Sequence, residues 1–116
     1  MKTLESFLPL SVATQHILLA LSNEDRHGYG IMQEVSRQSE GKYKLGPGTL
    51  YDNLEKLIDQ ELVTEVHRRD PKDHPRRRYY RLTALGRHVF SDEIARLESV
   101  VREGKLRLQA VKLREA

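Results

Sequence analysis

The sequence predicts a mainly α-helical protein with one small β-hairpin and a long C-terminal helix. Apolar residues recur at helical spacing in three segments before residue 60 and again from Phe90 to Val111. Between them, residues 62–83 contain two β-prone runs that flank a loop rich in Asp and Pro. Three helices followed by a hairpin form a winged helix-turn-helix. We therefore expect this domain over residues 1–83, followed by a dimerisation helix over residues 84–116.

Capping residues and apolar spacing predict the first two helices. Pro9 and Ser11 open the first helix. Its apolar residues that share one face are Val12, Ala13, Ile17, Leu18 and Leu21. A polar break at 22–25 precedes a second, shorter helix that ends near Glu40 and is expected to bury Tyr29, Met32 and Val35. Gly28 and Gly30 each lower helix propensity by up to about 1 kcal/mol, which indicates close packing against a neighbouring helix.

The third helix has the pattern of a DNA recognition helix. Pro47 suits its first position, and Leu50, Leu54, Leu57 and Ile58 point inward. The outer face then carries Thr49, Asp52, Asn53, Lys56 and Gln60. Free N–H groups at its glycine-flanked start favour a phosphate, Asn pairs with adenine, and Lys reaches guanine or phosphate. The candidate DNA contacts in this helix and the preceding turn are Lys42, Lys44, Gly48, Thr49, Tyr51, Asn53 and Lys56.

The hairpin carries the stronger electrostatic signal. Its strands are predicted at 62–69 and 76–83, with Val66, Tyr80 and Leu82 facing inward. Residues 67–87 contain eight basic and two acidic side chains, whereas residues 1–66 contain six basic and ten acidic ones. Such a local concentration of charge indicates a polyanion contact, and a merely solvated hairpin tip is the alternative. The candidate DNA contacts of this wing are Arg68, Arg69, Lys72, Arg76, Arg77 and Arg78.

The last helix is expected to begin after an N-cap at Thr83 and to run nearly to the C-terminus. Its apolar seam alternates spacings of four and three residues: Phe90, Ile94, Leu97, Val101, Gly104, Leu108 and Val111. A small domain cannot cover so long a seam, so we predict a homodimer that buries it. The alternative, in which the helix folds back on its own domain, needs a turn near Gly104. This glycine either permits a close helix approach or marks a bend.

Several classes of protein are not supported by the sequence. The absence of cysteine excludes disulfides, zinc–thiolate sites and cysteine nucleophiles. The five histidines show no metal-ligand spacing, and no serine has a recognisable base. We therefore predict no catalytic residue, metal or cofactor. The longest apolar run, Ile17 to Leu21, is too short to span a bilayer, and a cytoplasmic location is expected.

The order of several short motifs resembles the PadR family of transcriptional regulators, in its compact subgroup with a single C-terminal helix. These motifs are Ile17-Leu-Leu-Ala-Leu21, His27-Gly-Tyr-Gly-Ile31, Gly48-Thr-Leu-Tyr51, Leu62-Val63 and Tyr80-Arg-Leu-Thr83 with Gly86. The resemblance implies a homodimeric repressor of a pseudo-palindromic operator in double-stranded DNA. It also implies a small aromatic or hydrophobic effector near the dimer interface. Constitutive repression without a ligand is the alternative.

Two features of the third helix and the turn after it depart from this expectation. Asp52, Glu55 and Asp59 make the helix net acidic. A winged-helix module that binds a partner protein, without direct DNA reading, is therefore the alternative function. Glu61 stands where the family usually has a turn glycine, so the turn is expected to hold a non-glycine residue at positive φ.

Overall fold

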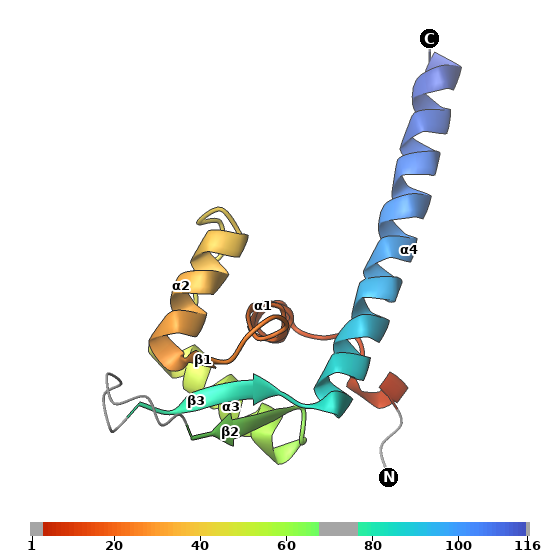
Figure 1. The fold of residues 1–116 in the computed structure, drawn as a ribbon. Helices are drawn as coiled ribbons and strands as arrows, with labels where there is room; N and C mark the ends of the chain where they lie inside the picture. Colours follow the sequence, from red (N-terminus) through yellow and green to blue (C-terminus); the bar gives the residue numbers. More distant parts are fainter. Residues whose placement is uncertain (1–3, 68–76, 116) are drawn as a thin grey trace.

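The fold combines a helical layer, a small sheet and one long projecting helix (Figure 1). The computed structural model describes residues 4–67 and 77–115. Its elements are the 3-10 turn η1 (Leu4–Phe7), α1 (Val12–Ala20), β1 (Arg26–His27), α2 (Gly28–Gln38), α3 (Pro47–Asp59), β2 (Val63–Val66), β3 (Tyr79–Leu82) and α4 (Ala84–Glu115). The predicted fold class, a winged helix-turn-helix with a long C-terminal helix, is confirmed.

The sheet has three antiparallel strands in the order β1-β3-β2. Within the hairpin, Val63 pairs with Leu82 and Val66 pairs with Tyr79. From the sequence we predicted only the two hairpin strands, and both predicted ranges are longer than the observed strands. It missed β1, which adds Arg26 and His27 to the free edge of β3. A strand of two residues has no measurable periodicity, so only the pairing with β3 reveals it.

The core lies between the three short helices, the sheet and the start of α4. Its buried apolar residues are Ile17, Leu18, Ala20, Leu21, Ile31, Val35, Leu45, Leu50, Leu54, Leu57, Leu62, Val63, Tyr80, Leu82 and Val89. The inward positions predicted for the third helix are confirmed, with Ile58 packed at the edge of this core. In the first helix Val12 is an exception, because at the first position of α1 it is 55% exposed.

The buried face of α2 differs from the predicted one. Gly28, Ile31 and Val35 are buried at spacings of three and four residues, which is the period of a helix. Tyr29 lies about a quarter turn away from this face and is 62% exposed. The prediction that Tyr29 belongs to the core was therefore wrong.

The turn between α3 and β2 joins the helical layer to the start of α4. Glu61 has a φ of 62°, which confirms the predicted non-glycine residue at positive φ. Its carbonyl accepts a 2.6 Å hydrogen bond from the Thr83 hydroxyl. The same hydroxyl accepts a 2.9 Å bond from the Gly86 N–H, so Thr83 is the predicted N-cap. An added Cβ at Gly86 would lie 2.1 Å from the Leu62 carbonyl oxygen, so only glycine allows this approach.

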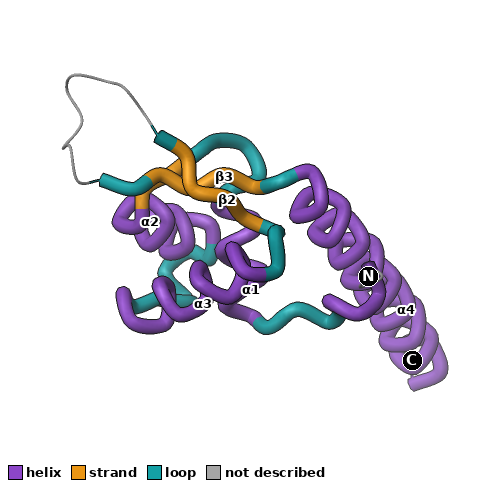
Figure 2. The backbone as a smooth tube through the Cα atoms, turned by 90° about the horizontal axis from the view of Figure 1, so that it is seen from below, coloured by secondary structure: helices purple, strands orange, loops and turns teal. Residues whose placement is uncertain are grey.

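Helix α4 leaves the body of the fold after its third turn. Figure 2 shows it extending away from the sheet and the other helices. Val89 and the carboxylate side chain of Glu93 are buried, and Phe90 packs against the protomer's own core. The helix continues through Gly104 without interruption, so a fold-back at that residue is ruled out. Within the described residues, no helix combines the length and apolarity needed to cross a membrane.

Candidate nucleic-acid interface

The first turn of α3 is open to solvent. Gly46, Pro47, Gly48 and Thr49 are all exposed, and Pro47 occupies the start of the helix as predicted. Gly46 is the N-cap and has no side chain to accept a bond from the first-turn N–H groups. These groups and the positive end of the helix dipole therefore face outward, where they favour an anion.

The outer face of α3 carries fewer free polar groups than predicted. Thr49 and Lys56 are exposed, as are Asp52, Glu55 and Asp59. Asn53 was placed on this outer face by the sequence, whereas the structure has it half-buried. Its Nδ2 donates to the Thr49 carbonyl at 2.7 Å, and its Oδ1 accepts from the Thr14 hydroxyl at 3.3 Å. Asn53 thus also links α3 to α1.

The turn before α3 presents its two lysines to solvent. Lys42 and Lys44 are exposed, while Leu45, between them and α3, is buried in the core. Glu40 and Gly41 both have positive φ and reverse the chain after α2. Anchoring by Leu45 therefore holds both cationic side chains on the outer surface close to the start of α3.

Two of the six wing candidates fall within the described residues. Arg77 and Arg78 are exposed and lead directly into β3. Arg78 Nε lies 3.5 Å from Glu65 Oε1 on β2, and such an exposed pair holds a side chain only weakly. The remaining candidates, Arg68, Arg69, Lys72 and Arg76, lie outside the described residues.

A groove of about 410 Å³ separates the start of α2 from α3 and β3. Its lining residues are His27, Gly28, Tyr29, Tyr51, Arg77, Arg78 and Tyr80. A Cβ at Gly28 would lie 2.3 Å from the Tyr51 hydroxyl, which confirms the predicted close packing there. The nearest atoms to a Cβ at Gly30 belong to His27, so close packing against a neighbouring helix is not found at this second glycine.

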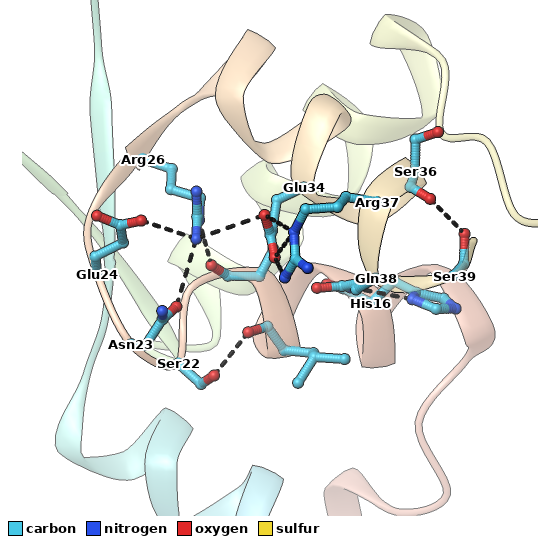
Figure 3. Close-up of polar contacts among 12 residues, drawn as sticks. His16, Ser22, Asn23, Glu24, Arg26, Glu34, Ser36, Arg37, Gln38 and Ser39 are labelled. Atoms are coloured by element: carbon cyan, nitrogen blue, oxygen red, sulfur yellow. Dashed lines mark hydrogen bonds and ion pairs between the residues drawn. The ribbon is translucent and has the colours of Figure 1, made fainter. Parts of the chain in front are cut away.

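A polar network holds the start of α2 in place beside this groove (Figure 3). Arg26 donates to the Ala20 carbonyl at the end of α1 at 2.6 Å and forms a 2.9 Å ion pair with Glu24. Glu34 on α2 binds Arg37 and lies 3.8 Å from Arg26. His27 caps α2 by accepting the Gly30 N–H at 3.0 Å, as expected of a structural histidine.

A bidentate ion pair fixes the far end of β3. Arg81 donates to both carboxylate oxygens of Asp25, at 3.0 and 2.8 Å. These hydrogen bonds to Asp25 raise the pKa of the Arg81 guanidinium. Two hydrogen bonds therefore hold the Arg81 side chain against Asp25. Arg77 and Arg78, which precede β3, are exposed, and Arg78 has only the longer contact with Glu65.

The predicted dimer seam is exposed over most of its length. Ile94, Leu97, Val101, Leu108 and Val111 are all at least 36% exposed. Phe90, the first residue of the predicted seam, packs instead against its own core. No atom lies within 4 Å of a Cβ built at Gly104. The apolar seam thus begins one turn later than predicted, and the described part of the protomer leaves much of it exposed.

Comparison with known proteins identifies the family. The model of the transcriptional regulator PadR-like family matches residues 17–92, which include all the elements of the candidate interface. This chain belongs to the PadR-like family. Transcriptional regulator Rv3488 of Mycobacterium tuberculosis is 37% identical over 88 residues, covering 76% of this chain and 78% of that protein.

Solved structures share the fold of this PadR-like chain. A PadR family transcription regulator from Clostridium difficile gives a TM-score of 0.72 at 20% identity, covering 84% of this chain and 99% of that one. Bacillus subtilis PadR in complex with operator DNA gives a TM-score of 0.63 at 22% identity, covering 74% of this chain and 48% of that one.

Membership of the PadR-like family makes the chain a transcriptional regulator and not an enzyme. Among the residues that the structure describes, no group of three His, Asp or Glu side chains is placed to hold a metal ion. Two residues that line the groove, Tyr29 and Tyr80, were not among the sequence candidates. The sequence assigned both to the core, which is right for Tyr80, and the only signal for Tyr29 was the polar break at 22–25.

Proposed function

We propose that this PadR-like chain forms a homodimeric, sequence-specific DNA-binding repressor. The observation that carries the proposal is the shared exposure of the first turn of α3 and of Arg77 and Arg78. One supplies uncapped N–H groups and the other supplies guanidinium groups, and both bind phosphate. The relative from Bacillus subtilis, which has the same fold, was solved with operator DNA.

In the proposed complex α3 lies in the major groove. Thr49 and Lys56 contact base edges or phosphates from its exposed face, and Asn53 contributes the amide hydrogen that Thr49 does not accept. Lys42 and Lys44 bind the backbone before the helix, and the wing binds it on the other side. The acidic side chains of α3 limit its own affinity, so most of the attraction to DNA comes from the turn and the wing.

The proposed dimer forms through the exposed seam of α4. Burial of Leu97, Val101 and Leu108 against a second copy removes apolar surface that the described residues of the protomer leave exposed. Pairing two heads in this way sets the distance between two recognition helices, which suits a pseudo-palindromic operator. A small aromatic or hydrophobic effector that binds next to this seam would change that distance and lower DNA affinity.

A salt titration tests the proposal. The probe is the tightest-binding duplex that the purified protein selects from a random DNA pool. Binding should weaken steeply with salt, with a logarithmic slope of about 0.9 for each phosphate contact. Arg77→Gln and Arg78→Gln should each reduce this slope on every sequence tested. Arg107→Gln, which removes an exposed arginine far along α4, is the matched control and should leave it unchanged.

Two results would contradict DNA binding. One is an affinity that hardly depends on salt, and the other is a selection that enriches no sequence. If the dimer ignored DNA but formed a stable complex with a defined partner protein, the acidic face of α3 would instead be a protein-docking surface.

A further inference from the structure

The groove between α2 and β3 is lined by a tyrosine whose hydroxyl has no hydrogen-bond partner among the described residues. Tyr80 is only 4% exposed, and its side chain lines the groove. No hydrogen bond joins its hydroxyl to any residue that the structure describes. No buried side-chain N or O atom among these residues lacks a partner, so the Tyr80 hydroxyl is not fully buried, and its residue lines this groove and a second one beside α3 and β2.

The charges around Tyr80 differ sharply between its two sides. On the α2 side the groove is lined by Arg77 and Arg78, and no carboxylate of the described residues lines it. On the other side a second groove, of about 370 Å³, shares Tyr51, Arg78 and Tyr80 with the first. Its lining adds three carboxylates, those of Glu55, Asp59 and Glu65. Only the α2 side therefore suits an anion, because carboxylates repel one on the other side.

The donors of the α2-side groove match the acceptors of a phosphodiester. Two guanidinium groups supply charge, and Tyr29 and Tyr51 lie at its border, 62% and 49% exposed. Burial raises the pKa of the Tyr80 phenol, and the neighbouring Tyr51 and Glu65 add to this shift. The Tyr80 hydroxyl therefore stays protonated and donates a hydrogen bond at neutral pH.

We infer that this groove binds one phosphodiester of the DNA backbone, with Arg77 and Arg78 as counter-charges and the Tyr80 hydroxyl as a hydrogen-bond donor. This inference rests on the DNA-binding function proposed above and identifies the partner of one part of that surface. Tyr29, at the start of α2, contacts the same strand at the groove border. The DNA strand follows the α2 side of Tyr80, away from Glu55 and Asp59.

The test combines a tyrosine variant with neutral backbone linkages. Tyr80→Phe removes only the hydroxyl and should weaken binding to the selected duplex roughly tenfold, the effect of one lost hydrogen bond to a charged group. The loss should be equal on all sequences and leave the salt slope unchanged, because a phenol releases no counterion. Tyr79→Phe, the adjacent residue on the opposite face of β3, is the matched control and should bind normally.

Methylphosphonate substitution then locates the phosphate. Replacing one symmetric pair of phosphates with methylphosphonates should weaken wild-type binding and remove the difference between wild type and Tyr80→Phe. The loss of affinity caused by Arg77→Gln should also disappear when the same pair of phosphates is replaced. Arg77 is exposed, so this second variant tests the groove even if Tyr80→Phe unfolds, which a thermal melt would reveal.

The outcomes separate this inference from the function on which it rests. If the wild type binds DNA in a salt-dependent way but Tyr80→Phe and Arg77→Gln couple to no single phosphate, the groove assignment is wrong and the proposed function stands. If the wild type binds no duplex, both are wrong.

Discussion

The backbone N–H of Leu10 donates a 2.7 Å hydrogen bond to the buried carboxylate of Glu93, 83 residues further along the chain. Gln15 donates to the same carboxylate at 3.4 Å, and Arg96 forms an ion pair with it. Leu10 lies just before α1 and Glu93 lies in α4. This contact therefore fixes the long helix to the helical layer that carries the candidate DNA surface.

Replacing Glu93 with Ala should lower the free energy of unfolding by about 2 kcal/mol, because the Leu10 N–H then loses its acceptor in a buried site. Urea denaturation at a fixed protein concentration measures this change. Asp92→Ala removes the neighbouring exposed carboxylate and should alter stability by less than about 0.5 kcal/mol. Equal effects of the two substitutions would show that the Leu10 contact contributes little.

The same carboxylate predicts a pH dependence. The hydrogen bond from Arg96, with those from Leu10 and Gln15, lowers the pKa of Glu93 below its ordinary value of 4.5 despite the opposing effect of burial. An acidic group whose pKa is lower in the folded state than in the unfolded state stabilises the folded protein. This stabilisation is complete at a pH above the unfolded pKa and is lost as the pH falls through the folded pKa. The stability difference between wild type and Glu93→Gln should therefore shrink below about pH 4.5. A difference that stays constant down to acid unfolding would contradict this assignment.

Gly86→Ala should destabilise the protein by about 3 kcal/mol, because the new methyl group meets backbone that cannot move aside. Its Cβ would lie 2.1 Å from the Leu62 carbonyl oxygen. Gly48→Ala is the control, since a Cβ there meets no atom within 4 Å. Thermal unfolding of both variants would check the prediction, which fails if Gly86→Ala melts like the wild type.

Glu61→Gly should stabilise the protein by about 1 kcal/mol, because glycine adopts a positive φ without the steric cost of a side chain. Glu61 has a φ of 62°, whereas the preceding Gln60 has a φ of −83°. Gln60→Gly should therefore destabilise the protein. The midpoints of urea unfolding would distinguish the two variants, and a loss of stability in both would show that the turn has no strain to release.

Val101→Glu should convert the proposed dimer to a monomer, since it places a charge within the apolar seam. Leu106→Glu is the matched control: Leu106 is also exposed but lies on the opposite side of α4 from Leu97. Sedimentation equilibrium should find monomers only for Val101→Glu. If both variants remained dimeric, another surface would have to form the dimer.

Much of the fold was predictable because its signals are local. Apolar residues three and four apart predicted the buried faces of α1 and α3, and Ser11, Pro47 and Thr83 predicted three helix starts. These features depend on hydrogen bonds and packing within one turn of chain. The positive φ of Glu61 was predictable for the same reason, as was the family, which depends on short motifs in a given order.

The predictions about the site were less complete because burial depends on distant segments. Tyr29 was assigned to the core but lies exposed, and Asn53 was assigned to the surface but bonds to Thr14. The residues next to Tyr29 and Asn53 in the sequence give no signal of either burial state. The pairing of β1 with β3 and the contact of Glu93 with Leu10 likewise join segments far apart in the chain.

The sequence by itself determined the helices, the hairpin, the basic wing and the membership of a regulator family. Only the tertiary structure decided that Tyr80 lies between a groove lined by two arginines and a second groove lined by carboxylates. The physical reason is that secondary structure follows from interactions within a few residues, whereas the electrostatic character of a groove depends on which distant side chains the fold brings together.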